Sequence, residues 1–354
     1  MIVSKELLAL LARFLLYKEE NNAMKSKKLL LTALTAVAFA SGLTACGGDK
    51  VDFKIGILQP VEHAALDAAQ NGFKEGVKEK LGDKTVEFNY LNAMASDANM
   101  SLYASDLVDA NDLNLGIGTG AALALKSASV TKGSTKPVLF TAVTDPVDAK
   151  LVNDKDAPEG FITGSSDMNP VVDQINLIQE VMPTVSKIGI LYTQSEVNSK
   201  VQSDMAESKI TELGLTPVIR TCTNSADITS AAQALVDDGV QAIYVPTDNN
   251  IAANMGAVKT PANAAHVLVM CGEEGMIKNG GHLTLSINYF DLGKQAGIMA
   301  ADILLKNKTI KETPVKYMTS TECTYVLSSK NLEAAQITIP DSVKTAHKWS
   351  DVDA

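Results

Sequence analysis

The sequence has 354 residues, roughly twice the usual length of a single domain, so two domains are the first expectation. Its 46% hydrophobic and 20% charged residues are typical of a globular α/β protein and exclude a disordered chain or an integral membrane protein. The net charge of -10 disfavours nucleic acid and anionic lipid surfaces as partners, because such contacts need clustered Lys and Arg side chains.

The N-terminal segment has the pattern of a bacterial secretory signal that starts at Met24. A basic run at 24–28 is followed by an apolar run at 29–40, which is too short to span a bilayer. The signal ends in LTAC at 43–46, which resembles a lipobox, so Cys46 is the predicted lipidation site and first mature residue. A buried apolar helix that ends at a chance cysteine is the alternative interpretation.

Residues 1–23 contain acidic side chains that a signal normally lacks, which indicates a misassigned start codon. A helix at the membrane surface is the alternative, although its polar face has few basic residues. We therefore interpret 1–46 as leader and signal peptide, and 47–52 as a short flexible tether.

From Phe53 onward, β-rich runs alternate with helical periodicities. The first series comprises strands at 53–58, 86–90, 115–118 and 138–140, with helices at 64–81, about 101–110 and 121–129. This βαβ alternation predicts a parallel sheet with helices on both faces, in which ligands bind at the carboxyl ends of the strands.

A second series of the same kind begins after residues 160–166. It comprises helices at 171–181, up to about 213, 228–237 and 251–259, with strands at 187–192, 216–221, 242–245, 266–271 and 284–288. Two α/β lobes in succession predict a clamshell with a ligand cleft between them.

Five motifs in this order and spacing resemble one known family. They are IGILQPVEH at 55–63, FTAVTDP at 140–146, GSSDM at 164–168, LYTQSEVNS at 191–199 and IYVPTDN at 243–249. The chain from about residue 53 to 340 is similar to ABC transporter substrate-binding proteins of the type I periplasmic-binding-protein fold, some of which bind aromatic amino acids. Departures at 118–121 and at Cys271 leave the ligand open.

The resemblance implies an α/β fold with two Rossmann-like lobes, each built on a parallel sheet. It implies three crossings between the lobes, near 163–167, 287–289 and 318–321, a helix at 291–306 that returns to the first lobe, and a segment at 325–340 that closes the second. The expected domains are 53–164 plus 289–318 for the first lobe, and 165–288 plus 319–345 for the second.

The function implied by the resemblance is that of an extracytoplasmic lipoprotein, lipid-anchored to the cell membrane. It would capture a small solute, with an aromatic amino acid as first choice, and deliver it to an ABC permease with its ATPase. A ligand-sensing lipoprotein that signals to a membrane receptor is the alternative. No Gly-x-Ser-x-Gly elbow, paired-His zinc motif or Walker loop is present, so we expect no enzymatic activity, cofactor or metal.

Candidate ligand-binding residues of the first lobe follow its predicted strands. In relatives, loop N–H groups and hydroxyls at a helix N-terminus bind the carboxylate of an amino acid. The candidates in such positions are Thr119, Ala121, Thr141, Val143 and Asp145. Each hydroxyl could instead cap a helix or turn, and Asp145 lies in a turn-like Thr-Asp-Pro sequence.

Three further candidates, Gln59, Glu62 and His63, follow the first predicted strand and overhang the mouth of the cleft. The imidazole of His63 could stack on an aromatic ligand, although a capping or packing role is the common alternative.

In the second lobe, Asp248 is the first choice for binding the ammonium group of the ligand, because a desolvated carboxylate discriminates strongly against ligands without an amine. A helix cap is its alternative role. The other candidates are Thr247, Asn249, Ser195, Glu196, Asn198 and Glu273. For Ser195, Glu196 and Asn198 a capping box or solvated loop is the alternative.

Three cysteines, Cys222, Cys271 and Cys323, remain once Cys46 is lipidated. An odd number gives no complete disulfide framework. A disulfide between Cys271 and Cys323 and a set of buried thiols are both compatible with the sequence.

Overall fold

The computed structural model describes residues 51–318 and 322–354. The leader, the secretory signal, the lipidation site Cys46 and part of the third expected crossing lie outside the described residues. No helix within the two described ranges has both the length and the apolar character needed to cross a membrane. Val51–Ala354 forms one compact unit by its internal contacts, and the fold described below is that of this unit.

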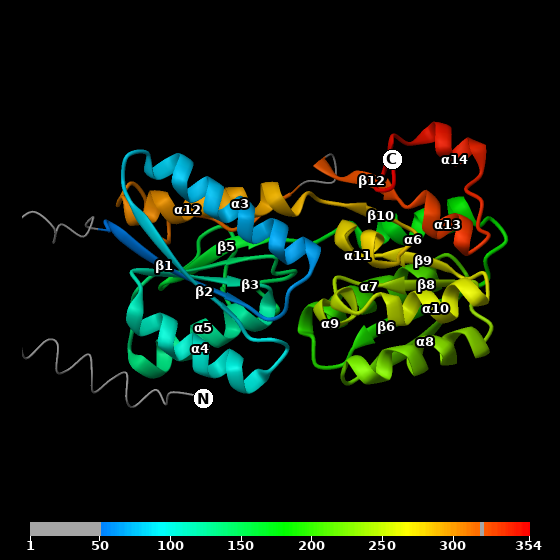
Figure 1. Cartoon of the computed structure of the whole chain (residues 1–354), viewed down its shortest axis with the longest axis horizontal. Coiled ribbons are helices and arrows are strands. Elements are labelled where there is room, and N and C mark those ends of the chain that lie inside the picture. The colour runs from blue at the N-terminus through cyan, green and yellow to red at the C-terminus, as the bar shows by residue number, and fades with distance from the viewer. Residues whose placement is uncertain (1–50, 319–321) are drawn as a thin grey trace, which may run out of the picture. The chain divides into compact units, whose positions relative to one another are not determined.

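The first lobe is built on a parallel six-stranded sheet with the order β11-β5-β4-β3-β1-β2 (Figure 1). Its strands are β1 Phe53–Gln59, β2 Val86–Asn92, β3 Leu113–Ile117, β4 Val138–Thr141, β5 Ile162–Ser166 and β11 Lys316–Tyr317. Strands β3, β4 and β5 are buried along their whole length, as expected for a sheet covered on both faces.

Two helical layers cover this first sheet. α3 Ala64–Leu81 and α12 Tyr289–Leu304 share one apolar cluster with β1 and β3, whereas α4 Asp97–Ala110 and α5 Thr119–Lys132 share another. The chain therefore returns from the second lobe at α12 to complete the core of the first.

The second lobe is built on a seven-stranded sheet with the order β13-β12-β10-β9-β8-β6-β7, in which only the pairing of β12 with β10 is antiparallel. Its strands are β6 Lys187–Thr193, β7 Thr216–Cys222, β8 Ala242–Val245, β9 Leu268–Cys271, β10 Leu283–Ser286, β12 Thr324–Leu327 and β13 Trp349–Asp351. Both lobes thus have the parallel-dominated α/β architecture that the sequence predicts.

Helices flank the second sheet as well. They are α6 Val171–Val181, α7 Val197–Glu212, α8 Ile228–Asp237, α9 Asn249–Ala253, α10 Gly256–Ala264, α11 Glu274–Asn279, α13 Ser329–Ala334 and α14 Asp341–Ala346, with a 3-10 turn at Ser225–Asp227. One apolar cluster contains residues of α8 to α11 and another contains residues of α6 and α7, so this sheet is also covered on two sides.

The predicted single helix at 251–259 is wrong, because the structure has two helices there. α9 ends at Ala253 and α10 begins at Gly256. The side chain of Asn254 donates to the Asn250 carbonyl at 2.8 Å, and Asn and Gly are both poor residues for a helix interior. The sequence analysis also missed α11, whose six residues include Gly275 and are too few to show a helical period.

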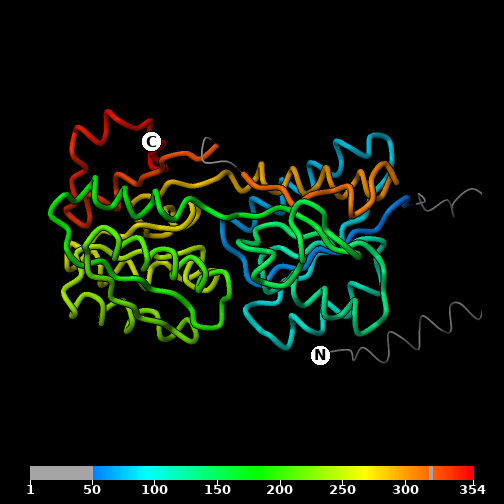
Figure 2. Tube along the Cα trace, turned by 180° about the vertical axis from the view of Figure 1, so that it is seen from behind, coloured from blue at the N-terminus to red at the C-terminus, as the bar shows by residue number. Residues whose placement is uncertain are grey.

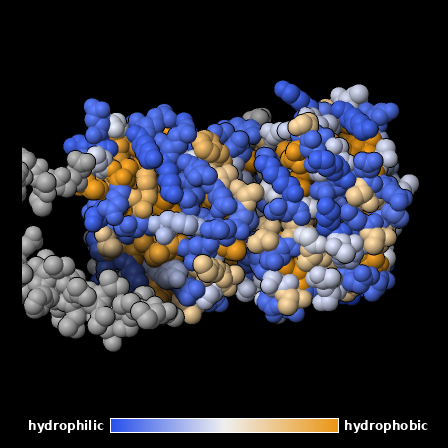
Figure 3. All heavy atoms as spheres, viewed as in Figure 1, coloured by the Kyte–Doolittle hydropathy of each residue, from blue (hydrophilic) through white to orange (hydrophobic). Residues whose placement is uncertain are grey.

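α3 and α12 lie side by side although they are far apart in the sequence (Figure 2). Gly72 and Gly76 on α3 and Gly293 and Gly297 on α12 allow this approach, because a Cβ at any of them would overlap backbone atoms of the facing helix. The face seen in Figure 3 is largely hydrophilic with scattered apolar residues, which is normal for a protein surface.

We predict that Gly72→Ala destabilises the protein by about 1–3 kcal/mol, because the new methyl group would overlap the Phe290 carbonyl oxygen and force the two helices apart. Urea unfolding measures this loss. Gly256→Ala is the matched control, since nothing lies within 4 Å of a Cβ there. Equal unfolding midpoints for the two variants would contradict the close-packing account.

Candidate functional site

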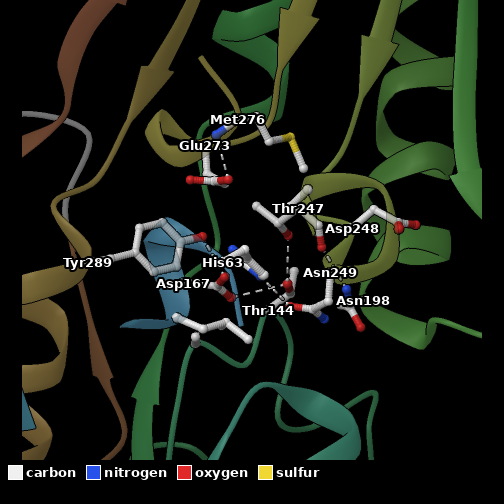
Figure 4. Close-up of a pocket in the computed structure, with 13 residues that line it drawn as sticks. His63, Thr144, Asp167, Asn198, Thr247, Asp248, Asn249, Glu273, Met276 and Tyr289 are labelled. Carbon is white, nitrogen blue, oxygen red and sulfur yellow. Dashed lines mark hydrogen bonds between the residues drawn. The ribbon is translucent and has the colours of Figure 1, made fainter. Parts of the chain in front are cut away.

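A cavity lies where the two lobes meet, and we call it the interlobe cavity (Figure 4). The space in and around it that no atom fills is about 270 Å³, which includes open solvent, whereas the space free for the centre of a water molecule is about 10 Å³. The residues that line it are His63, Leu66, Ala142, Thr144, Asp167, Asn198, Thr247, Asp248, Asn249, Ala252, Glu273, Met276 and Tyr289.

Most polar lining residues follow the carboxyl ends of strands. Thr144 follows β4, Asp167 follows β5, Asp248 follows β8 and Glu273 follows β9. The lobes therefore present their strand ends to one another, as expected for ligand sites in this architecture. Ala142 has a φ of 55°, a left-handed conformation that is costly for a residue with a Cβ and that six other non-glycine residues of the described chain also adopt.

Asp167 is a buried carboxyl group without a cationic partner among the described residues. Its two oxygens accept hydrogen bonds from Thr144 Oγ1 at 3.1 Å and from the Tyr289 hydroxyl at 2.7 Å. A carboxylate can accept about four hydrogen bonds, so capacity remains for a ligand. Burial raises the pKa of Asp167, although both hydroxyls favour its ionised form.

Glu273 is the second buried carboxyl group that faces the cavity. It caps α11 by accepting hydrogen bonds from the backbone N–H groups of Gly275 and Met276. Burial raises the pKa of Glu273 to about 8, and the charges of Glu274 and Asp167 act in the same direction. None of the lining residues that the structure describes is Lys or Arg, so the cavity favours a positively charged ligand group.

Asp248, the sequence-based choice for the ammonium partner, is occupied by its own lobe. Its carboxylate accepts hydrogen bonds from Thr193 N at 2.6 Å, Thr193 Oγ1 at 2.8 Å, Ser199 Oγ at 2.9 Å and Ile251 N at 2.9 Å. These four donors fill its acceptor capacity and make it the cap of α9. The geometry therefore favours the capping alternative for Asp248, whereas Asp167 keeps free acceptor capacity.

Hydrogen bonds join the two lobes across the cavity. Gln202 Nε2 of the second lobe donates to Thr144 Oγ1 of the first lobe at 3.3 Å, and Thr247 Oγ1 lies 3.4 Å from Thr144 Oγ1. His63 Nε2 lies 3.1 Å from Asn249 Oδ1 (Figure 4). These bonds indicate a closed arrangement of the lobes.

The sequence-predicted residues fall into two groups. The structure brings six of them together in the lining of the interlobe cavity: His63, Asn198, Thr247, Asp248, Asn249 and Glu273. The other nine do not line it: Gln59, Glu62, Thr119, Ala121, Thr141, Val143, Asp145, Ser195 and Glu196.

Most of this second group has local partners instead. Gln59 bonds to Val61 O and Asp67, Thr141 accepts from Ser165, and Asp145 accepts from the N–H groups of residues 147 and 148. Ala121 and Val143 belong to an apolar cluster of the first lobe. Glu62 and Ser195 line separate surface hollows.

Two of the predicted residues, Glu196 and Thr119, do not line the cavity but are relevant to the site. Glu196 accepts hydrogen bonds from Asn198 Nδ2, from the N–H groups of Asn249 and Asn250, and from Asn249 Nδ2, so it holds two lining residues in place. Thr119 is the first residue of α5, and its buried Oγ1 has no hydrogen-bond partner among the described residues.

Sequence reasoning missed seven lining residues: Leu66, Ala142, Thr144, Asp167, Ala252, Met276 and Tyr289. Thr144 and Asp167 lie inside two of the quoted motifs, and Tyr289 lies in an expected crossing. An acidic residue in a crossing between two lobes was the signal that could have identified Asp167.

The cysteines of the described residues form no disulfide. Cys222 and Cys271 are buried, and burial raises the pKa of both thiols. No group of three or more His, Cys, Asp or Glu side chains in residues 51–318 and 322–354 is arranged to hold a metal ion.

Comparison with known proteins gives the family context of this site. Residues 54–349 match a family described as ABC transporter substrate binding protein. The chain is 33% identical over 317 residues to a tyrosine-binding protein from Clostridioides difficile (strain R20291), a match that covers 84% of this chain and 90% of that protein. More distant solved solute-binding proteins share the type I periplasmic-binding-protein fold.

Two solved structures have similar sequence identity to this chain and differ in their bound state. An ABC domain from Streptococcus pneumonia in complex with L-Trp is 32% identical, covers 85% of this chain and 99% of that chain, and has a TM-score of 0.78. The ligand-free, open structure of a substrate binding protein from Clostridium difficile is 30% identical, covers 84% and 99%, and has a TM-score of 0.63. The greater likeness to the L-Trp complex agrees with the hydrogen bonds that join the lobes here.

We predict that Asp248→Asn destabilises the protein by about 1–3 kcal/mol, whereas Asp167→Asn costs less than about 1 kcal/mol. An amide at position 248 would face the backbone N–H groups of Thr193 and Ile251, which cannot become acceptors. The hydroxyl partners of Asp167 can rotate to accept from an amide. Urea unfolding measures both, and the reverse order of stabilities would refute the capping role of Asp248.

We also predict that Glu273 contributes stability to the free protein that is lost as the pH rises from about 4.5 to about 8. The pKa of Glu273 is raised from its ordinary value of 4.5 to about 8, so folding favours its protonated form and this contribution is lost as the carboxyl ionises. Unfolding free energies at pH 5 and pH 8 measure the effect. In Glu273→Gln the unfolding free energy should differ less between pH 5 and pH 8 than it does in the unmodified protein. An unchanged difference would show that Glu273 is not responsible.

Proposed function

Because the chain belongs to the ABC transporter substrate-binding protein family, we propose that it captures a free amino acid with an aromatic side chain in the interlobe cavity. Membership in this non-enzymatic family confirms both the sequence resemblance and the expectation that the protein is not an enzyme. The name of the tyrosine-binding relative and the L-Trp bound to the solved homologue support the choice of ligand class.

The observation that carries the proposal is the pair of buried carboxyl groups in a lining without basic side chains. An ammonium group placed between Asp167 and Glu273 would supply the missing positive charge and make charge-assisted hydrogen bonds. It would also satisfy the acceptor capacity that the hydroxyls of Thr144 and Tyr289 leave unused on Asp167. A ligand without an amine would leave both carboxyl groups buried and unpaired.

The carboxylate of the ligand has a candidate site at the start of α5. This helix has 14 residues, so its first N–H groups carry the positive end of a substantial helix dipole. The buried and unpartnered hydroxyl of Thr119 lies in its first turn. A Cβ at Gly118 would lie 3.9 Å from Asn249 Nδ2, which places this helix start beside the cavity lining.

Part of the remaining lining is apolar and can pack against a large side chain. Leu66, Ala142, Ala252 and Met276 provide aliphatic surface, and Tyr289 provides a ring. An aromatic ligand side chain buries much apolar area and packs well against such groups.

The wider role follows from the family. We propose that the protein is a lipid-anchored, extracytoplasmic component that closes on its ligand and delivers it to an ABC permease with its ATPase. The anchor would be Cys46, which lies outside the described residues. A ligand-sensing lipoprotein that signals to a membrane receptor has the same cavity but a different docking partner, and permease and ATPase genes beside this one would favour import.

We predict that residues 47–354 bind L-Tyr, L-Trp or L-Phe with selective stabilisation in a thermal-shift screen of amino acids and other small solutes. For each ligand found, the analogue without the amine should bind at least about tenfold more weakly, because it leaves buried carboxyl groups unpaired. Isothermal titration calorimetry measures the ratio.

Asp167→Asn is the matched variant for this test. It should weaken binding of the amino acid much more than binding of the analogue without an amine, so the ratio falls. Binding of a non-amine solute alone would reject the amino-acid ligand, and an unchanged ratio in Asp167→Asn would reject Asp167 as the amine partner.

A further inference from the structure

His63 lines the interlobe cavity with one ring nitrogen that is bonded and one that is not. Nε2 lies 3.1 Å from Asn249 Oδ1, whereas Nδ1 is buried and has no hydrogen-bond partner among the described residues. The residue is 8% exposed. A buried polar atom without a partner is unfavourable, so a ligand group that bonds to Nδ1 would gain affinity from it.

The neighbours of His63 determine which kind of ligand group this is. Asn249 Nδ2 donates to Glu196 Oε2 at 2.8 Å, so the amide oxygen of Asn249 is the atom that faces the imidazole. The orientation is fixed because the two carboxylate oxygens of Glu196 also accept from the N–H groups of Asn249 and Asn250. His63 Nε2 must therefore carry the proton, and Nδ1 presents a lone pair.

Burial keeps this imidazole neutral. It lowers the pKa of His63, and the hydrogen bond to Asn249 and the charge of Asp67 oppose the shift only in part. Nδ1 is thus a buried acceptor that no described side chain satisfies.

Two donors of an aromatic amino acid could meet this acceptor, the ammonium group or a polar hydrogen on the ring. The ammonium group is drawn to Asp167 and Glu273, because a carboxyl group that can ionise is a stronger partner for a cation than a neutral nitrogen. Beside Asn249 and the charge of Asp67, His63 has aliphatic neighbours in the cavity lining. Leu66 lies one turn further along α3, Ala252 lies one turn beyond Asn249 on α9, and both line the cavity.

We propose that His63 Nδ1 accepts a hydrogen bond from the ring of the bound amino acid, either the phenol hydroxyl of tyrosine or the indole N–H of tryptophan. His63 is then the residue that selects these two ligands against phenylalanine, and Asn249 and Glu196 are positioning residues that fix its tautomer. This inference rests on the proposed function, since it names the ligands within the proposed class. A site that holds a buried acceptor rejects a ligand without the matching donor.

The test compares three ligands that differ in this one donor. Isothermal titration calorimetry of residues 47–354 with L-Tyr, L-Phe and 4-fluoro-L-phenylalanine should show tyrosine binding at least about tenfold tighter than the other two. The fluorine occupies the place of the hydroxyl but cannot donate. In His63→Leu, the affinity for tyrosine should fall until it is nearly equal to the affinity for phenylalanine.

Asn249→Ala is a second test, because it removes the partner that fixes the tautomer of His63 but keeps the imidazole ring. It should lower the ratio of the tyrosine affinity to the phenylalanine affinity, but by less than His63→Leu does. Melting curves show whether each variant is folded, and the comparison of ligands on the unmodified protein needs no variant.

Equal affinities for tyrosine and phenylalanine in the unmodified protein would overturn the inference. Equal losses for both ligands in His63→Leu would overturn it too, because Nδ1 would then bind a group that the ligands share. If none of the three ligands nor L-Trp binds, the proposed function itself fails. The two failures are therefore distinguishable.

Discussion

Two buried carboxyl groups without a cationic partner are the constraint on which this site depends. Asp167 and Glu273 are buried in the lining of the interlobe cavity, and none of the described lining residues is Lys or Arg. Burial of an unpaired carboxylate is costly, and the raised pKa values of both groups reflect this cost. If a cationic ligand group fills the cavity as proposed, its charge would favour the closed arrangement, and ligand binding and closure would be coupled.

Asp167 and the hydroxyl that donates to it lie in the segments where the chain crosses between the lobes. Asp167 lies between β5 of the first lobe and α6 of the second, and Tyr289, which donates to it, begins the helix that returns to the first lobe. Asn169 donates to the Tyr289 hydroxyl and accepts from the Ile287 backbone, so the two crossings are tied together beside the ligand site. A ligand charge at Asp167 therefore acts on the segments about which the lobes would move.

Much of this fold was predictable from the sequence, because hydrophobic periodicity and strand spacing are local signals. The helices at Ala64–Leu81, Val171–Val181 and Ile228–Asp237 have the predicted bounds. The site was less predictable, because the partners of a carboxylate come from distant segments. Asp248 follows a buried strand as an amine partner would, yet Thr193 and Ser199 from the neighbouring β6–α7 region occupy it. Thr144 and Tyr289 donate one hydrogen bond each to Asp167 and leave it able to accept more. Both are far from Asp167 in sequence, so this arrangement could not be read from the local pattern.

Glu273, whose pKa of about 8 keeps it protonated in the free protein at pH 7, should ionise when an ammonium group binds beside it. Isothermal titration calorimetry at pH 7 with the aromatic amino acid that binds most tightly, in buffers of different ionisation enthalpy, counts the protons exchanged on binding. Because the pKa of Glu273 is about 8 in the free protein, the account predicts release of up to about one proton per ligand bound. A binding enthalpy that does not depend on the buffer, or net proton uptake, would contradict it.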